Sequence, residues 1–190
     1  MSEVKITPKG EKMDAKMKGN IIAGMMAGSL LLAILAVFGG SWLTPDDPVD
    51  DVDYSTSLSS QEASGDGMTI EVDYSEYCDE TDDEDFCSAA TAGTVGTIGL
   101  WLGILCAALA LAMIVLPMAG IDALDAMPEM VQKIVPWAAG GLILVSALLW
   151  LILMPELDET SVGMSFYIAV IAGLLGLGSQ AVGMFVPADE

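Results

Sequence analysis

The chain alternates long apolar runs with polar segments, and four of the runs have the length of a membrane span. About 20 helical residues cross a hydrocarbon core that is about 30 Å thick. The runs contain no Asp, Glu, Lys, Arg or His, and they lack the polar face of amphipathic helices in soluble proteins. They cover residues 21–43, 89–116, 134–154 and 162–186. The pattern predicts an all-α membrane protein, a bundle of four transmembrane helices.

The basic residues predict the orientation of these spans. All six are lysines; five lie within residues 1–20, and the sixth, Lys133, lies in the connecting segment 117–133. Segments on the cytoplasmic side of a membrane are enriched in Lys and Arg. We therefore expect a multi-pass protein of the cell membrane whose two termini and middle connection are cytoplasmic. The remaining segments are the large outer loop 44–88, the short outer turn 155–161 and the C-terminus 187–190.

The outer loop 44–88 carries sixteen of the 27 acidic residues and no basic one. From Met68 to Tyr74, apolar residues alternate with polar ones, which is the period of a half-buried strand. Residues 49–58 resemble a second strand, and the Ser- and Gly-containing stretch 59–67 resembles the turn between them. The sequence thus predicts a small β-hairpin or sheet inside a large acidic extracytoplasmic loop.

The same loop holds Cys78 and Cys87, the only cysteines outside the spans. Because the loop is expected to face an oxidising compartment, we predict a disulfide between them. Closing so short a loop is worth about 2–3 kcal/mol. An acidic cluster lies between the cysteines: Asp79, Glu80, Asp82, Asp83, Glu84 and Asp85. Oxygen ligands suit Ca²⁺, but the EF-hand pattern is absent, so we expect a solvated surface with loose cation association and assign no metal site.

Small residues recur at helical spacing within the spans. Such residues let the backbones of membrane helices approach closely. The positions are Gly24, Gly28, Gly99, Gly103, Ala169, Gly173, Gly176 and Gly183. Two interpretations are open, packing inside the bundle and contact between protein molecules in the membrane, and the first is the commoner role of any one motif.

The residue inventory argues against several classes of function. The chain has no histidine and no arginine, which removes Ser-His and Cys-His nucleophiles and histidine metal sites. A net charge of −21 repels nucleic acid. Ionisable groups inside spans mark proton and ion pathways, and the spans have none. We therefore expect neither an enzyme nor a cofactor.

The layout resembles the claudin and peripheral-myelin-protein group of four-helix membrane proteins. Trp42 lies at the very end of the first span, and Cys78 and Cys87 have nearly the cysteine spacing of that group. The resemblance implies cytoplasmic termini and a first outer loop folded as a small sheet. The outer loop 44–88 lacks the Gly-Leu-Trp of the group and has Tyr74 and Tyr77 before Cys78 instead, so adhesion or pore formation is not carried over.

The leading hypothesis is a structural or interaction protein of the membrane with a disulfide-tied acidic cap. Its partners would be the lipid bilayer and either further copies of itself or another membrane protein. One alternative is an accessory subunit of a larger transport or electron-transfer complex. Another is a homo-oligomeric cation pathway, with the acidic loop as an electrostatic funnel.

Overall fold

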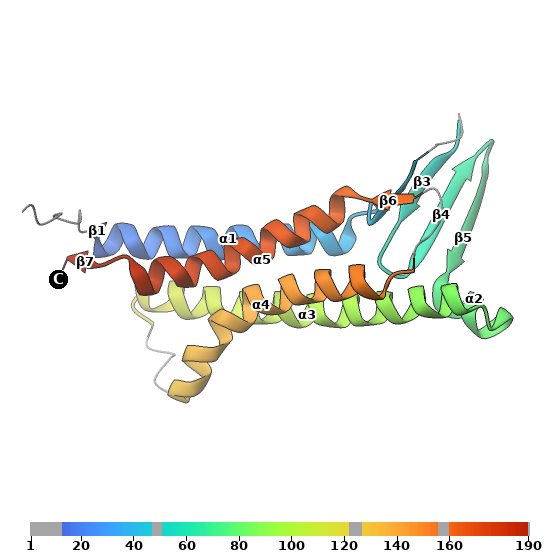
Figure 1. Ribbon diagram of the computed structural model, residues 1–190. Helices are drawn as coiled ribbons and strands as arrows, with labels where there is room; N and C mark the ends of the chain where they lie inside the picture. Colours follow the sequence, from blue (N-terminus) through green and yellow to red (C-terminus); the bar gives the residue numbers. More distant parts are fainter. Residues whose placement is uncertain (1–12, 47–50, 122–126, 156–159, 190) are drawn as a thin grey trace, which may run out of the picture.

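Four long helices run side by side, and most of the strands gather at one end of them (Figure 1). The computed structural model describes residues 13–46, 51–121, 127–155 and 160–189. The long helices are α1 (Ala15–Phe38), α3 (Glu84–Met118), α4 (Glu129–Leu153) and α5 (Met164–Phe185), and α2 (Tyr74–Thr81) is short. All four long helices are long and apolar enough to cross a membrane, which indicates a multi-pass membrane protein.

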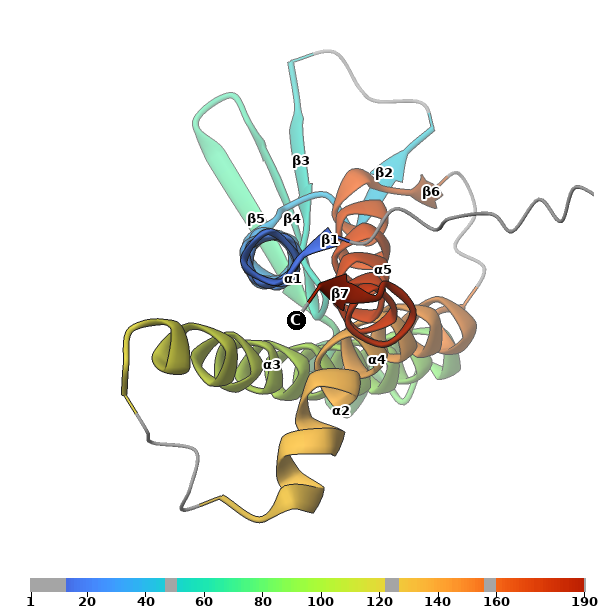
Figure 2. The same cartoon turned by 90° about the vertical axis from the view of Figure 1, so that its left-hand side faces the viewer.

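The bundle is small inside and bulky outside. α1 packs on α3 and α5, and α4 packs on the same two helices, an arrangement visible along the bundle axis in Figure 2. The interior is rich in alanine, with Ala33, Ala107 and Ala172 fully buried. Large side chains such as Leu31 and Ile152 point outward and are well exposed. This distribution suits helices that pack by close backbone approach in lipid.

The largest sheet has three antiparallel strands in the order β3 (Asp53–Thr56), β4 (Ser60–Gly65) and β5 (Met68–Asp73). Asp66 and Gly67 join β4 to β5, and both have a positive φ, as a two-residue type I′ turn requires. The small sheet predicted for the outer loop is therefore present.

Two further strand pairs join the beginning of the chain to its end. β2 (Leu43–Pro45) pairs antiparallel with β6 (Thr160–Val162) beside the large sheet. At the opposite end of the bundle, β1 (Met13–Asp14) pairs parallel with β7 (Ala188–Asp189).

The helices begin and end away from the limits that hydropathy suggests. α1 begins at Ala15, where Asp14 accepts a hydrogen bond from the Lys16 N–H, and ends at Phe38. Leu43, expected at the end of the first span, lies in β2. α3 begins inside the acidic cluster because Asp83 caps it. Hydropathy detects the apolar part of a helix, whereas polar first turns are set by capping side chains.

The prediction of a turn at residues 59–67 is wrong, because Ser60–Gly65 is the central strand of the sheet. Its Ser, Gln and Gly residues have turn-like propensities. A strand paired on both sides is decided by its neighbours more than by propensity. The strand predicted at 68–74 is confirmed as β5, except that Tyr74 begins α2.

Candidate functional site

The end of the bundle that carries the sheet forms a unit that we term the cap, comprising residues 39–46, 51–88 and 160–163. Trp42 lies at its base and is fully buried. The Trp42 indole N–H donates to the Ala36 carbonyl at 2.8 Å, and its ring meets Trp150 of α4 edge to face, with centroids 4.9 Å apart. The Trp150 indole N–H in turn donates to the carbonyl of Leu58, at 3.4 Å. The two tryptophans thus connect α1, α4 and the β3–β4 turn.

Backbone hydrogen bonds fix the segment before β2 from two sides. On one side, the Trp42 N–H donates to the Thr56 carbonyl and the Thr56 N–H donates to the Gly40 carbonyl, both at 2.9 Å. On the other side, the Gly163 N–H donates to the Trp42 carbonyl, also at 2.9 Å. The segment is therefore held between β3 and the start of α5.

The β3–β4 turn sits directly on α3. Leu58 at its tip is buried, and a Cβ placed on Gly96 would lie 3.2 Å from the Leu58 side chain and 3.1 Å from that of Trp150. A Cβ on Gly93 would lie 3.1 Å from the Ser59 Cα. Sequence reasoning missed both glycines. Their spacing could have identified them, because Gly93, Gly96 and Gly99 follow one another at intervals of three residues. Gly99 already belongs to the GxxxG pair that the sequence analysis selected.

A disulfide joins α2 to the first turn of α3, as predicted. Cys78 and Cys87 are bonded, with Cα atoms 4.8 Å apart. Beside the bridge, the Tyr77 and Phe86 rings pack with centroids 4.3 Å apart. The short helix is therefore held both covalently and by an aromatic contact.

The start of α2 contains two side chains with shifted pKa values. The Asp73 carboxylate caps the helix; a hydrogen bond from the Ser75 hydroxyl, helped by backbone N–H groups of Ser75 and Glu76, lowers its pKa. Tyr74 is buried, and desolvation raises its pKa to about 12. The Tyr74 hydroxyl has no hydrogen-bond partner within the described part of the chain.

The acidic cluster is divided between two helix ends. Asp79 and Glu80 lie on the last turns of α2, whereas Glu84 and Asp85 lie in the first turn of α3. Asp83 accepts hydrogen bonds from the Asp85 N–H at 3.0 Å and the Phe86 N–H at 3.4 Å. Carboxylates in a first helical turn stabilise the helix through its dipole. Over the described residues, no group of three or more His, Cys, Asp or Glu side chains is arranged to hold a metal ion.

Four of the small residues lie where helices meet. A Cβ on Gly103 would be 3.0 Å from the Ile143 N, and one on Gly173 would be 2.8 Å from the Leu144 N. Gly99 faces Ser146, and a Cβ on Gly176 would be 2.7 Å from the Cα of Gly140. Ala169 is fully buried as well. These positions serve packing inside the bundle, and Gly140 is a contact that sequence reasoning missed.

The other three small residues do not lie at close contacts. A Cβ on Gly24 would meet no atom within 4 Å. On Gly28 and Gly183 it would make ordinary contacts, with Leu175 at 3.8 Å and Ile22 at 3.7 Å. The Gly24–Gly28 motif has the same spacing as the packed pairs, so spacing alone does not separate an inner face from an outer one.

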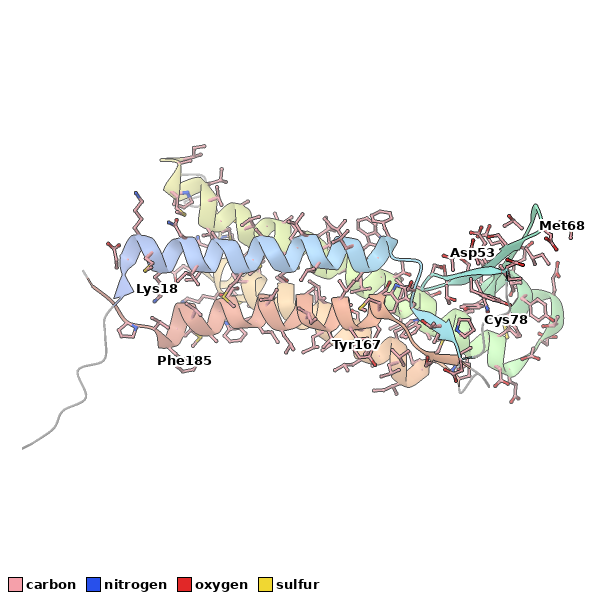
Figure 3. All side chains as sticks on the ribbon, turned by 90° about the horizontal axis from the view of Figure 1, so that it is seen from above. Lys18, Asp53, Met68, Cys78, Tyr167 and Phe185 are labelled. Atoms are coloured by element: carbon pink, nitrogen blue, oxygen red, sulfur yellow. A yellow bond between two sulfur atoms is a disulfide. The ribbon has the colours of Figure 1, made fainter. Side chains whose placement is uncertain are left out.

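The two ends of the bundle differ in charge. At the end opposite the cap, the Lys18 ammonium donates to the Gly183 carbonyl at 2.8 Å (Figure 3). Lys133 forms an exposed pair with Glu129, 3.6 Å apart. Residues 44–88 contain no basic side chain. The described lysines therefore lie at the end of the bundle opposite the cap, and the cap carries carboxylates without a basic side chain.

Exposed aromatic side chains lie near both ends of the helices. Near the cap, Trp101 packs on Phe38 with ring centroids 6.0 Å apart, and Tyr167 lies in the first turns of α5. Phe185 ends α5 at the far end (Figure 3). At 1.5 Å per residue, Tyr167 and Phe185 are about 27 Å apart along the helix. This separation is close to the thickness of a bilayer core, and Trp and Tyr side chains such as Trp101 and Tyr167 are enriched at bilayer interfaces.

The sequence matches no protein-family model, and no curated protein matches it.

Proposed function

We propose that this chain is a non-enzymatic interaction protein of the cell membrane that presents the cap outside the cell. The observation that carries the proposal is the way in which the cap is mounted. Trp42 and Trp150 seat it on the helices, backbone hydrogen bonds fix it to α5, and the disulfide fixes α2 to α3. A surface held so firmly at the end of a membrane bundle is suited to recognition, because binding then orders few groups.

The orientation in the proposal rests on charge. The lysines of α1 and α4 lie at the end opposite the cap, which the positive-inside rule assigns to the cytoplasm. Both described chain ends lie there too, joined by β1 and β7. The cap then lies in the oxidising compartment that its disulfide needs.

Thiol labelling tests the orientation. Asp46→Cys and Lys133→Cys are made separately in a Cys106→Ser background, so that the Cys78–Cys87 disulfide remains closed. An impermeant maleimide added to intact cells should label the cysteine at position 46 alone, and the cysteine at 133 should label only after permeabilisation. External labelling at position 133 contradicts the proposal.

Replacement of the sheet tests the function. Residues 53–73 are exchanged for a Gly/Ser linker of equal length, which retains the four helices. We expect this variant to insert in the membrane but to lose the cross-linked complexes that the full chain forms in its own host. The variant Leu109→Val, at an exposed position of α3 far from the cap, is the matched control. Retention of every complex by the linker variant contradicts an interaction role for the cap.

A second candidate, an accessory subunit of a larger membrane complex, is favoured by the outer face of α1. Gly24 lies there with open space around it, on the same face of the helix as the exposed Met17 and Leu31. A glycine on a lipid-facing surface leaves room for the helix of another protein. In that case Gly24→Leu should release a co-purifying subunit without changing the stability of the isolated chain, and an unchanged complex would contradict it.

A further inference from the structure

The three-stranded sheet has one apolar face and one acidic face. The register aligns Tyr54, Ala63 and Ile70 in one row across β3, β4 and β5. Met68 and Val72 flank Ile70 on the same face, because side chains alternate along a strand. The neighbouring row places Ser55, Glu62 and Glu71 on the opposite face. The sheet is therefore amphipathic, as the sequence pattern of β5 predicts.

The apolar face is covered only near the bundle. Tyr74, at the foot of β5, is buried and Val72 is half-buried, whereas Ile70 is 67% exposed and Met68 is 71% exposed. Met68 begins β5, next to the β4–β5 turn, and this end of the sheet lies away from the four long helices (Figure 1). A small sheet normally needs its apolar face packed against something. Exposed apolar side chains on an otherwise charged surface mark a site of interaction.

The uncovered face continues into a free strand edge. Within the described residues, β5 has a strand neighbour only on its β4 side. The outer side of β3 differs, since Thr56 is hydrogen-bonded to Gly40 and Trp42. In a two-residue hairpin the closing pair, here Gly65 and Met68, is hydrogen-bonded, and the pattern then alternates. The backbone groups of Thr69 and Glu71 consequently point to the open edge.

Charge decides what fits this edge. Glu62 and Glu71 are direct cross-strand neighbours, a destabilising pair with no basic residue anywhere in the cap to offset it. A second copy of β5 would bring further carboxylates to the same place, and an anionic lipid surface would be repelled in the same way. A cationic strand would instead relieve the repulsion.

We propose that an extended segment of a partner protein, alternating apolar and basic residues, adds to β5 as a fourth strand. Its apolar side chains would extend the face formed by Met68 and Ile70, and its Lys or Arg side chains would lie beside Glu71 on the acidic face. Main-chain hydrogen bonds to Thr69 and Glu71 would complete the pairing. This inference rests on the proposed function, since it needs the cap to be an accessible interaction surface.

The test uses the full chain in nanodiscs made of zwitterionic lipid. The probe is a blocked, fluorescent nonapeptide that alternates lysine with valine or threonine, and binding is followed by fluorescence anisotropy. Three control peptides have the same length: one with the order shuffled, one with glutamate in place of lysine, and one N-methylated at alternate residues. We expect the alternating cationic peptide to bind and each control to bind at least about tenfold more weakly, because order, charge and backbone pairing all contribute.

Variants of the chain locate the site. Met68→Thr combined with Ile70→Thr places β-branched residues, which favour strands, at both positions but removes the apolar patch, and should weaken binding about tenfold or more. Glu71→Gln should weaken binding and flatten its salt dependence. Glu84→Gln, an equal change of charge on α3, is the matched control and should bind like the unchanged chain. Thr69→Pro removes an N–H at the open edge and should abolish binding.

Other outcomes overturn the inference. Equal binding by all these variants would mean that the peptide responds only to overall charge. Equal binding of the shuffled or N-methylated peptide would exclude strand addition. Self-association of the chain through Met68 and Ile70, or their insertion into added vesicles, would assign the patch to a second copy or to lipid. None of these results would affect external labelling at position 46 or the loss of complexes on replacing the sheet, so the proposed function stands or falls separately.

Discussion

Replacing Gly140 by alanine should separate α4 from α5 and destabilise the bundle. A Cβ at this position would lie 2.7 Å from the carbonyl oxygen of Gly173 and 2.7 Å from the carbonyl carbon of Gly176, and it would also press on the Leu177 N. All three are backbone atoms, so no flexible side chain can move aside. The added methyl group can be accommodated only if the helices move apart.

The magnitude follows from two opposing terms. Overpacking of a well-packed interior costs about 1–3 kcal/mol. The change from Gly to Ala returns up to about 1 kcal/mol of helix propensity. We therefore expect a net loss of about 1–2 kcal/mol for Gly140→Ala. For Gly24→Ala, where a Cβ meets no atom within 4 Å, only the propensity term remains and stability should stay equal or rise.

Equilibrium unfolding in mixed micelles, followed by tryptophan fluorescence, measures both variants. Trp150 is fully buried on α4 and packs on Phe166 of α5, so its fluorescence reports on unfolding of this helix pair. The spacing of small residues selects Gly24 as a packing residue and gives no reason to select Gly140. The two variants therefore distinguish an argument from the structure from one based on motif spacing. An unchanged Gly140→Ala protein beside a destabilised Gly24→Ala protein would refute the arrangement of α4 and α5 described above.

Three further predictions concern the cap. Trp42→Phe should speed hydrogen exchange in the cap and cost about 1–3 kcal/mol, because it removes the hydrogen bond to Ala36 and part of the buried ring. Reducing the Cys78–Cys87 disulfide should increase hydrogen exchange in α2, because loss of the bond removes an entropic stabilisation of about 2–3 kcal/mol. Hydrogen exchange in α4 and α5 should stay unchanged. Because burial raises the pKa of Tyr74 to about 12, its contribution to stability is full below pH 10 and should be lost as the pH rises from 10 to 12. Tyr74→Phe should abolish that alkaline loss in pH-dependent unfolding without lowering stability at neutral pH, since its hydroxyl has no partner among the described residues.

The long-range pattern of hydropathy was enough to predict the four apolar helices. A span needs an apolar surface on all sides, and this requirement leaves a strong signal in the sequence. The disulfide was predictable because Cys78 and Cys87 stand apart from the spans in a loop expected to be oxidised. The strand at Met68–Asp73 was predictable because a two-residue period has few other causes.

The seat of the cap was not predictable, because it depends on residues distant in sequence. No residue near Trp42 in the sequence indicates that the Trp150 ring packs against it. Nor does the local sequence indicate that the Leu58 carbonyl accepts a hydrogen bond from the Trp150 indole. The central strand of the sheet carries a turn-like sequence and exists through its two neighbours. Which glycines face inward is likewise set by how the helices are rotated, and Gly24 and Gly176 have similar local sequences but opposite surroundings.

The hydrogen bond between the Gly163 N–H and the Trp42 carbonyl has a consequence for how the protein is made. The two residues are separated by about 120 residues of chain, which a ribosome needs about 6–24 s to produce at 5–20 residues per second. For most of that interval the first span and the sheet have been synthesised, whereas β6 and α5 do not yet exist. The Trp42 carbonyl therefore lacks this hydrogen-bond partner during synthesis. The base of the cap is completed only when the last helix enters the membrane beside the first. A nascent chain arrested before Gly163 should consequently expose this segment to proteases that cannot reach it in the finished protein.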